Sequence, residues 1–364
     1  MAVTVERMRF KAEALRGFVE RALIAVGVSA TDAALASDVL VMSDLRGIES
    51  HGVARLERFY VDRIREGIIN PKAVQATIKE TPVSIAVDAN HGLGHPVAVR
   101  TMRRTIEKAK TSGVAVGTVR RSNHFGIAGY YAMMAMEHDC VGVASTNAGR
   151  LAVPTGGREP MLGTNPFAYA LPGEDGDSFV LDMATTTVAL GKLEIARRLG
   201  KPIPEGWAVD KDGNSTTDPE AGMLGALLPL GGFGTESGGH KGFGLAVLAD
   251  MLCAVLGGGV FTPDMPSQRN ILDPGIVSNF FMAIRIDNFR DPKEFRRDVS
   301  RSLRAFRECP PAPGFDRVYT AGEPEKIRTE EHLRNGVGLD PVVVASLNSV
   351  AQKLNIEPLA PLPG

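Results

Sequence analysis

The sequence predicts an α/β fold of mixed α+β character, with a largely antiparallel sheet and separate helical subdomains. Helical periodicity fills the first 75 residues and returns after residue 290. Between these regions, short runs rich in β-branched and aromatic residues follow one another closely, mostly without intervening helices. Parallel strands need long crossovers, so this spacing favours antiparallel pairing. We therefore expect a sheet domain at residues 76–289, and a helical part in which residues 1–75 pack with residues 290–364.

The N-terminal region is predicted to form three amphipathic helices. The first covers residues 10–26 and ends at Gly27. Ser29 opens the second, with Asp32 three residues later in a variant of the capping box. A third helix is expected over residues 52–65. Its inward stripe is predicted to be Val53, Leu56, Tyr60 and Ile64.

Strand-type runs follow, separated by glycine, proline and asparagine turns. They are "VSIAVDAN" (83–90), "VAVGTVR" (114–120), "CVGVASTN" (140–147), "PFAYALP" (166–172), "SFVLDMAT" (178–185) and "SNFFMAIRI" (278–286). Helices are expected at residues 98–113, 189–200, 242–256, 292–306 and 340–354. The sheet is therefore expected to be mixed or largely antiparallel.

The composition is typical of a globular protein. The 364 residues are 44% hydrophobic and 23% charged, and 41 basic residues face 42 acidic ones. This balance lacks the basic excess of a nucleic-acid-binding protein. No apolar run is long and unbroken enough to span a bilayer, and the N-terminus lacks the apolar core of a signal peptide. With three widely spaced cysteines, the chain is expected to be soluble and cytoplasmic.

Several nucleotide and metal motifs are missing. No G-x-G-x-x-G follows an early strand, and "GGHKGFG" (238–244) lacks the G-K-[ST] of a phosphate loop. Any nucleotide is therefore bound by a non-Rossmann fold. His91 and His95 are four residues apart, but the glycines and the proline around them predict a turn with satisfied histidines rather than a zinc site.

The segment "RGIESHGVAR" (46–55) carries polar residues that a purely structural helix would not need. Ser50 is a natural N-cap, which would place His51 in the first turn of the third helix. Arg55 follows four residues later and projects from the same face. An imidazole can exchange a proton with a hydroxyl near neutral pH, and a guanidinium can hold a carboxylate. The residues alone support two interpretations about equally. One is a catalytic histidine beside a carboxylate-binding arginine, and the other is a capped helix whose histidine and arginine lie on the surface.

Three other segments are candidates for binding. His124 stands in a loop after a strand, where a hydrogen-bonded structural histidine is the more common case. Asp182 and the threonines of residues 185–187 stand at a strand end. His240 and Lys241, among glycines before a long helix, could present N–H groups and an ammonium to an anion. By themselves these residues indicate an enzyme with an anion-binding site.

Taken together and in order, these segments resemble the type 2 malate/L-lactate dehydrogenase family. The resemblance covers nearly the whole chain. Its motifs are "SDLRGIESHGVARL" (43–56), "SNHFGIAGYY" (122–131), "GTNPFAYALP" (163–172), "DMATTTVALGK" (182–192), "LLPLGG" (227–232), "GGHKGFGLA" (238–246) and "AGEPE" (321–325). The family includes ureidoglycolate, sulfolactate and diketogulonate oxidoreductases and an imine-reducing branch.

The resemblance implies a non-Rossmann, malate/L-sulfolactate dehydrogenase-like fold that binds NAD or NADP, and a homodimer with a shared active site. His51 would be the acid/base, oriented by Ser50. His124 is a second candidate, ranked after His51, because some members of the family are assigned it as the proton acceptor. The cofactor contacts would fall on Gly52, Thr164, Asp182, Met183, Ala184, Thr185, His240, Lys241, Gly322 and Glu323.

The expected reaction is hydride transfer between a nicotinamide and a small 2-hydroxy acid. Arg55, Arg121 and Gly191 are the expected substrate contacts, and Lys192 is expected to share the carboxylate or polarise the carbonyl. Lys192 favours a keto or hydroxy acid, because the imine-reducing branch has an acidic residue there. There are two alternatives to this function: an imine reductase acting on a cyclic 2-carboxylate, and a non-catalytic NAD-binding dimer. The sequence leaves the identity of the acid and the choice between NAD and NADP open.

Overall fold

A computed structural model describes residues 7–262, 264–267 and 276–362. Residues 1–6 and 363–364 of the expected helical part therefore lie outside the described residues, as do 263 and 268–275 of the expected sheet domain.

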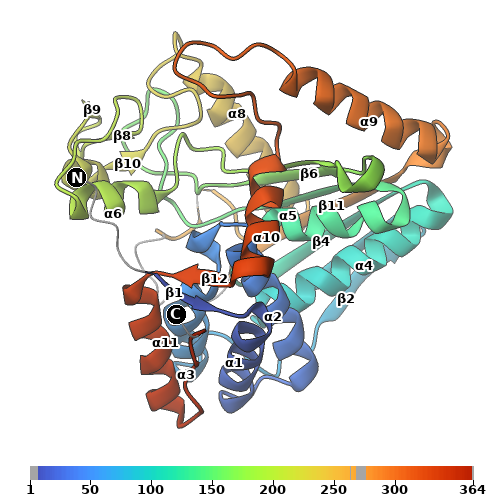
Figure 1. Ribbon diagram of the computed structural model, residues 1–364, viewed down its shortest axis with the longest axis horizontal. Helices are drawn as coiled ribbons and strands as arrows, with labels where there is room; N and C mark the ends of the chain where they lie inside the picture. The colour runs from blue at the N-terminus through green and yellow to red at the C-terminus, as the bar shows by residue number, and fades with distance from the viewer. Residues whose placement is uncertain (1–6, 263, 268–275, 363–364) are drawn as a thin grey trace.

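A seven-stranded sheet crosses the molecule, from β6 in the upper part of the view to β2 below its middle (Figure 1). Its strands, in spatial order, are β2 (Ala76–Thr81), β3 (Ser84–Asp88), β4 (Val114–Ser122), β11 (Val277–Arg285), β5 (Cys140–Thr146), β6 (Phe167–Leu171) and β7 (Phe179–Met183). Within this sheet, β3 and β4 are parallel and all other neighbours are antiparallel. The predicted mixed, largely antiparallel sheet is confirmed.

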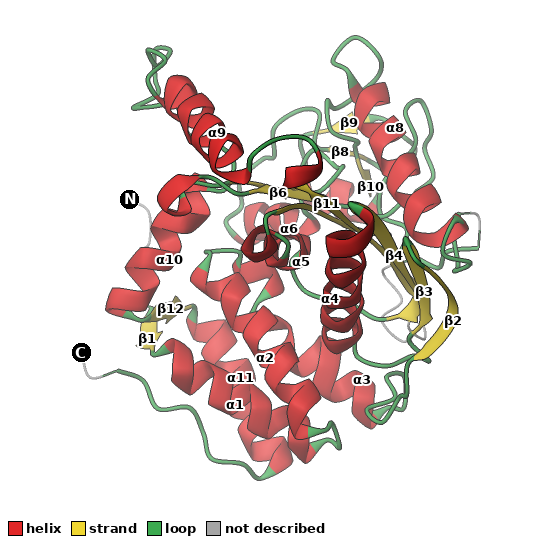
Figure 2. Ribbon diagram, turned by 90° about the vertical axis from the view of Figure 1, so that its right-hand side faces the viewer, coloured by secondary structure: helices red, strands yellow, loops and turns green. Residues whose placement is uncertain are grey.

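Helices cover both faces of the sheet (Figure 2). Because side chains alternate along a strand, β11 serves two cores. Phe281 and Ala283 pack beneath α4 (Gly94–Ser112) and α5 (Ala128–Met134). Phe280 packs on the opposite face with Cys253, which belongs to the π-helical end (Met251–Val255) of α8 (Gly239–Asp250).

A helical base lies below the sheet and joins the two ends of the chain (Figure 1). It contains α1 (Ala12–Ala25), α2 (Ala30–Leu45), α3 (Asp62–Arg65), α11 (Pro341–Leu354), and the pair β1 (Met8–Phe10) and β12 (Val337–Leu339). Apolar residues from both ends share one core, among them Leu15, Phe18, Leu347 and Val350. Ser29 caps α2 by accepting from the Asp32 N–H at 3.2 Å, as predicted.

Two further groups of elements complete the chain. Helix α10 (Glu323–Asn335) contacts α2, and α9 (Pro292–Arg307) packs against the turn Glu174–Gly176 at the sheet edge. A small lobe contains α6 (Leu190–Arg198), α7 (Pro219–Leu224), β8 (Ala208–Val209), β9 (Ser215–Thr216) and β10 (Ala226–Leu227). Among the helices of the described residues, none is long and apolar enough to cross a membrane.

The expected third helix is irregular. It consists of two 3₁₀ turns (Glu49–His51 and Val53–Arg55), a π-helix (Leu56–Val61) and the short α3. The prediction of one α-helix over residues 52–65 was therefore wrong, although its four inward residues are all buried. Helices α5, α7 and α10 and the strands β1, β2, β12 and β8–β10 were not predicted, because short or strongly charged segments have weak periodicity.

Candidate active site

The segment that carries His51 is a 3₁₀ turn rather than the start of an α-helix. Gly52 has an extended ψ of −150°, which ends the turn directly after His51. Ser50 lies inside this turn and does not cap a helix, so the predicted N-cap was wrong. Its hydroxyl instead lies 2.8 Å from Nδ1 of His51. Ser50 therefore contacts the imidazole whose orientation it was expected to fix.

Asp44, near the end of α2, supports this turn from the interior. One carboxyl oxygen accepts a hydrogen bond from the backbone N–H of Val53 at 2.8 Å. A Cβ on Gly52 would overlap the same carboxyl group, so glycine is required there. Burial raises the pKa of Asp44 to about 8. The buried carboxyl thus fixes the backbone directly after His51.

The immediate surroundings keep His51 neutral. Burial, and to a smaller extent the Arg55 cation, lowers the pKa of His51 to about 4. Arg55 Nε donates to the carbonyl of Ser50 at 2.5 Å, and its guanidinium carbon lies 4.7 Å from the ring centroid of Phe59. A neutral imidazole and an oriented guanidinium therefore lie next to each other, as base and carboxylate-binding group would.

The fold brings His124 to His51 from a distant part of the sequence. His124 follows β4, and its ring stacks on that of His51 with centroids 5.4 Å apart and planes inclined by 26°. Nδ1 of His124 lies 2.5 Å from the Tyr60 hydroxyl. Burial, followed by the charges of nearby groups, lowers the pKa of His124 well below its usual value. Both candidate proton acceptors therefore occupy one site.

His95 departs from its expected place in a turn. It is the second residue of α4, because a proline is tolerated in the first turn of a helix. The ring is fully buried, 4.8 Å from that of Tyr60, and neither nitrogen finds a hydrogen-bond partner among the described residues. Burial lowers its pKa to about 3. The prediction of a satisfied turn histidine was therefore wrong for His95, whereas His91 does lie in a turn.

One group of expected cofactor residues borders a cavity next to this turn. The cavity has a volume of about 300 Å³, and Asp182 and Gly322 are among its lining residues, with Arg46 and Ile48. The carbonyl of Ile48 accepts from the His51 N–H at 3.0 Å, so the cavity adjoins the turn that carries His51.

Two of the three charged side chains that line this cavity, Asp182 and Arg46, are themselves buried, and the third is Glu325. Asp182 accepts from the Gly129 N–H at 2.7 Å, and burial raises its pKa to about 6. Arg46 is 9% exposed, and its Nε has no hydrogen-bond partner among the described residues. A carboxylate and a guanidinium whose Nε has no partner among the described residues border one cavity, and they suit a ligand that carries hydroxyl and phosphate groups.

A second group of expected cofactor residues gathers around Leu230. Thr185 donates from its N–H to the Thr164 carbonyl at 2.9 Å, and its own carbonyl accepts from Leu230. Helix α8 begins at Gly239 rather than near residue 242 as predicted, so His240 and Lys241 are exposed in its first turn. A Cβ on Gly242 would overlap the Leu230 backbone, which shows how closely the helix approaches this segment.

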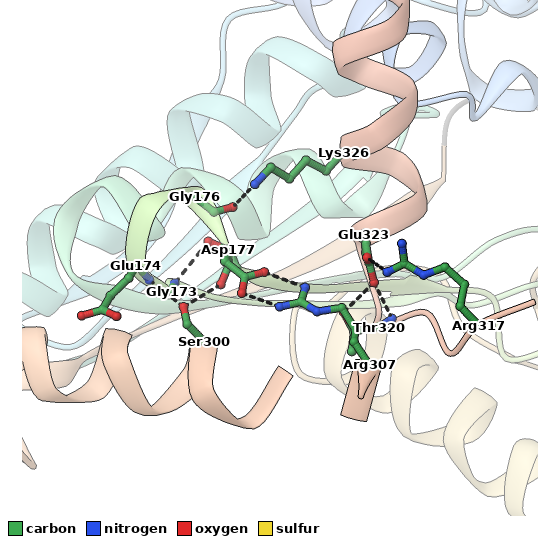
Figure 3. Close-up of polar contacts among 11 residues, drawn as sticks. Gly173, Glu174, Gly176, Asp177, Ser300, Arg307, Arg317, Thr320, Glu323 and Lys326 are labelled. Atoms are coloured by element: carbon green, nitrogen blue, oxygen red, sulfur yellow. Dashed lines mark hydrogen bonds and ion pairs between the residues drawn. The ribbon is translucent and has the colours of Figure 1, made fainter. Parts of the chain in front are cut away.

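Glu323 lies at the first position of α10 and is held by its neighbours (Figure 3). One carboxylate oxygen accepts from the Arg317 guanidinium. The other accepts from the N–H and the hydroxyl of Thr320, at 3.1 and 3.3 Å. Further along the helix, Lys326 donates to the carbonyl of Gly176 at 3.1 Å. The carboxylate of Glu323 is thus already paired within the chain.

Within the described ranges, Gly191, Lys192 and Arg121 are not among the residues found in hydrogen bonds or ring contacts with the two stacked histidines. Gly191 and Lys192 stand at the start of α6, where Lys192 is exposed. Arg121 donates from Nε to Asp88 at 2.8 Å and from Nη2 to Asn90 at 2.6 Å. The guanidinium of Arg121 therefore forms an ion pair with Asp88.

Three residues were missed as functional candidates. Tyr60 was predicted only as part of an apolar stripe, although it is the one residue of that stripe with a hydroxyl. Asp44 and Arg46 stand in "SDLRG", directly before the turn that carries His51. The signal that could have identified them is a pair of charged residues at the end of the second predicted helix. In the described ranges, no three His, Cys, Asp or Glu side chains gather as metal ligands would.

Comparison with known proteins identifies close relatives along the whole chain. A family model described as malate/L-lactate dehydrogenase matches residues 10–348. Malate dehydrogenase of Pyrococcus horikoshii is 43% identical over 97% of both chains. The structure of malate dehydrogenase from that organism superposes with a TM-score of 0.88 at 40% identity, covering 98% of both chains. L-sulfolactate dehydrogenase of Methanocaldococcus jannaschii is 38% identical over 91% of this chain and 92% of its own.

The names of other relatives differ in their cofactor. Ureidoglycolate dehydrogenase of Escherichia coli K12, named with NAD(+), is 35% identical over 91% of this chain and 92% of its own. A (2R)-3-sulfolactate dehydrogenase of Chromohalobacter salexigens, named with NADP(+), is 38% identical over 66% of this chain and 69% of its own.

Proposed function

This chain belongs to the malate/L-lactate dehydrogenase family, and we propose that His51 is the residue that exchanges a proton with the substrate hydroxyl. The reaction is hydride transfer between a nicotinamide cofactor and a small 2-hydroxy acid. The observation that carries the proposal is the neutral His51 ring, which contacts Ser50 and stacks on His124. The backbone N–H of His51 also bonds the carbonyl of Ile48, which lines the cavity bordered by Asp182.

In the proposed oxidation, His51 accepts the proton of the C2 hydroxyl, since its lowered pKa leaves a nitrogen lone pair free at neutral pH. Arg55 holds the substrate carboxylate with its forked donors. We assign this role to Arg55 because the Arg121 guanidinium is paired with Asp88. Lys192 and Gly191 stay candidates for the far end of the substrate.

We propose NAD as the cofactor, bound across the two groups of residues described above. Bound nicotinamide supplies the hydride acceptor. Asp182 suits ribose hydroxyls and Arg46 suits a phosphate, since both are charged groups on one cavity. The rest of the cofactor would be held by Thr164, Thr185, His240 and Lys241, together with Met183 and Ala184, which follow Asp182 in the chain.

We also propose a cytoplasmic homodimer with a shared active site. Exposed apolar side chains lie on α8 and its π-helical end and offer a surface for a second copy. They are Leu245, Leu248, Met251, Val255 and Leu256. Light scattering of the purified protein tests the dimeric state, and a monomer at micromolar concentration would contradict it.

The experiment that tests the function is a substrate screen that follows the absorbance of reduced nicotinamide. Malate, lactate, sulfolactate and ureidoglycolate are each offered with NAD and with NADP, and cyclic imine 2-carboxylates with the reduced cofactors. We expect turnover of at least one 2-hydroxy acid, fastest with NAD. Turnover of the imines alone would overturn the proposal.

A further inference from the structure

The hydroxyl of Tyr60 contacts His124 in the protein interior. Tyr60 is fully buried, and its Oη lies 2.5 Å from Nδ1 of His124. The π-helix that contains Tyr60 explains why this side chain reaches His124. Because its turns are wider than those of an α-helix, the consecutive residues Phe59 and Tyr60 both contact the imidazole, with ring centroids 5.5 and 6.0 Å away.

A second donor points to the same nitrogen. The backbone N–H of Gly126 donates to Nδ1 of His124 at 3.4 Å. Gly126 has a φ of +79°, and a Cβ there would come within 2.7 Å of Val39. Only glycine therefore fits the conformation that directs this N–H toward the ring.

Both neighbours of Nδ1 need an acceptor. A backbone N–H can only donate, and burial raises the pKa of the Tyr60 phenol, so its hydroxyl keeps its proton. Among the described residues, the hydrogen bond found for that hydroxyl is the one to His124. A proton on Nδ1 would leave the hydrogens of Tyr60 and Gly126 without an acceptor, which is rare for buried donors.

We propose that Tyr60, with the Gly126 amide, holds His124 in the tautomer that keeps its proton on Nε2. Tyr60 is then a positioning residue of the active site. The free Nε2–H of His124 is a fixed hydrogen-bond donor, while the adjacent His51 keeps the role of proton acceptor.

The consequence for the reaction rests on the proposed function. During oxidation the C2–H bond breaks and its electron pair leaves with the hydrogen as hydride, which the oxidised nicotinamide accepts. The hydroxyl proton passes to His51. His124 donates from Nε2 to the same oxygen, which becomes the carbonyl, and so stabilises charge on it in the transition state.

The tautomer can be read directly by nitrogen NMR of the free protein labelled with ¹⁵N in its histidine rings. The chain has seven histidines, and the His124 signals are assigned by their loss in His124→Gln. We expect a protonated-type shift for Nε2 and a lone-pair shift for Nδ1. The reverse pattern, with the proton on Nδ1, would overturn the proposal.

Tyr60→Phe removes the donor with little change in shape. We expect His124 to show a mixture of tautomers and kcat to fall about 10-fold or more, with KM within about 2-fold of the wild type. Tyr130→Phe is the matched control, since its hydroxyl bonds Asp38 at 2.7 Å instead of an imidazole. Unchanged tautomer and kcat in Tyr60→Phe would contradict the proposal.

The two readouts separate this inference from the proposed function. An active 2-hydroxy acid dehydrogenase whose His124 carries its proton on Nδ1 would refute the positioning role alone. A protein with the expected tautomer but without turnover of any 2-hydroxy acid would refute the proposed function alone.

Discussion

The buried carboxyl of Asp44 accepts the backbone N–H of Val53 at 2.8 Å, and this bond fixes the chain two residues after His51. No side chain of the turn itself performs this task, because Ser50 bonds the imidazole and Arg55 bonds the Ser50 carbonyl. The position of the proposed base therefore depends on an acid in the preceding helix.

Gly52→Ala should distort this turn, since the added methyl group overlaps the Asp44 carboxyl. We expect a loss of about 1–3 kcal/mol in the free energy of unfolding, and a large loss of kcat because His51 moves. Urea denaturation and steady-state kinetics measure the two effects. Gly244→Ala in α8 is the control: nothing lies within 4 Å of the new Cβ, so stability should hold or rise slightly.

Asp44 should make folding stability depend on pH. Its pKa is about 8 in the folded protein and near 3.8 when unfolded, so between these values only the folded state keeps the proton. Stability from this group is fully present below about pH 4 and is lost as the pH rises toward 8, at roughly 1.4 kcal/mol per pH unit.

Asp44→Asn tests this dependence, because the amide oxygen can still accept from Val53 but does not ionise. The difference in unfolding free energy between wild type and variant, measured in urea from pH 4 to 8, should change with that slope. The buried Asp182 titrates in both proteins and cancels in the difference. A difference that stays constant with pH would show that Asp44 does not titrate in this range.

His51→Ala should lower kcat by roughly 100-fold or more, in line with loss of a general acid/base, while the dissociation constant of the cofactor changes little. Turnover kinetics and fluorescence titration with reduced nicotinamide measure the two quantities. His138→Ala removes an exposed histidine as control and should behave as the wild type. A variant at His51 with near wild-type kcat would exclude it as proton acceptor.

Arg55→Lys should raise the KM for the 2-hydroxy acid about 10-fold and affect kcat less, because an ammonium lacks the planar fork that binds a carboxylate and stacks on Phe59. Arg58→Lys changes an exposed neighbour in the same segment and serves as control. Equal KM values for the two variants would assign the carboxylate to another cation, with Lys192 the next to test.

Most strands of the central sheet, and its helices α4 and α8, could be predicted because their signals are local. The runs that form β4, β5, β6 and β11 have a strand composition bounded by turn residues, and Gly113 and Ser29 mark helix ends. The pairing of β1 with β12 could not be predicted, since it joins residues more than 300 positions apart through strands of three residues.

The candidate site was predicted in part for the same reason. Ser50, His51 and Arg55 form one short motif, and His124 stands in another, so both could be named. Their stacking arises from tertiary packing. The π-helix, which turns Tyr60 toward His124, and the burial of Asp44 leave no periodic signal in the sequence.

The most direct test of the account is a crystal structure of the protein with nicotinamide cofactor and an unreactive 2-keto acid analogue. We predict that His51 lies within hydrogen-bond distance of the analogue's C2 oxygen, with C4 of the nicotinamide on the opposite side of that carbon. An imidazole of His51 turned to bulk solvent, many ångströms from C2, would contradict the account.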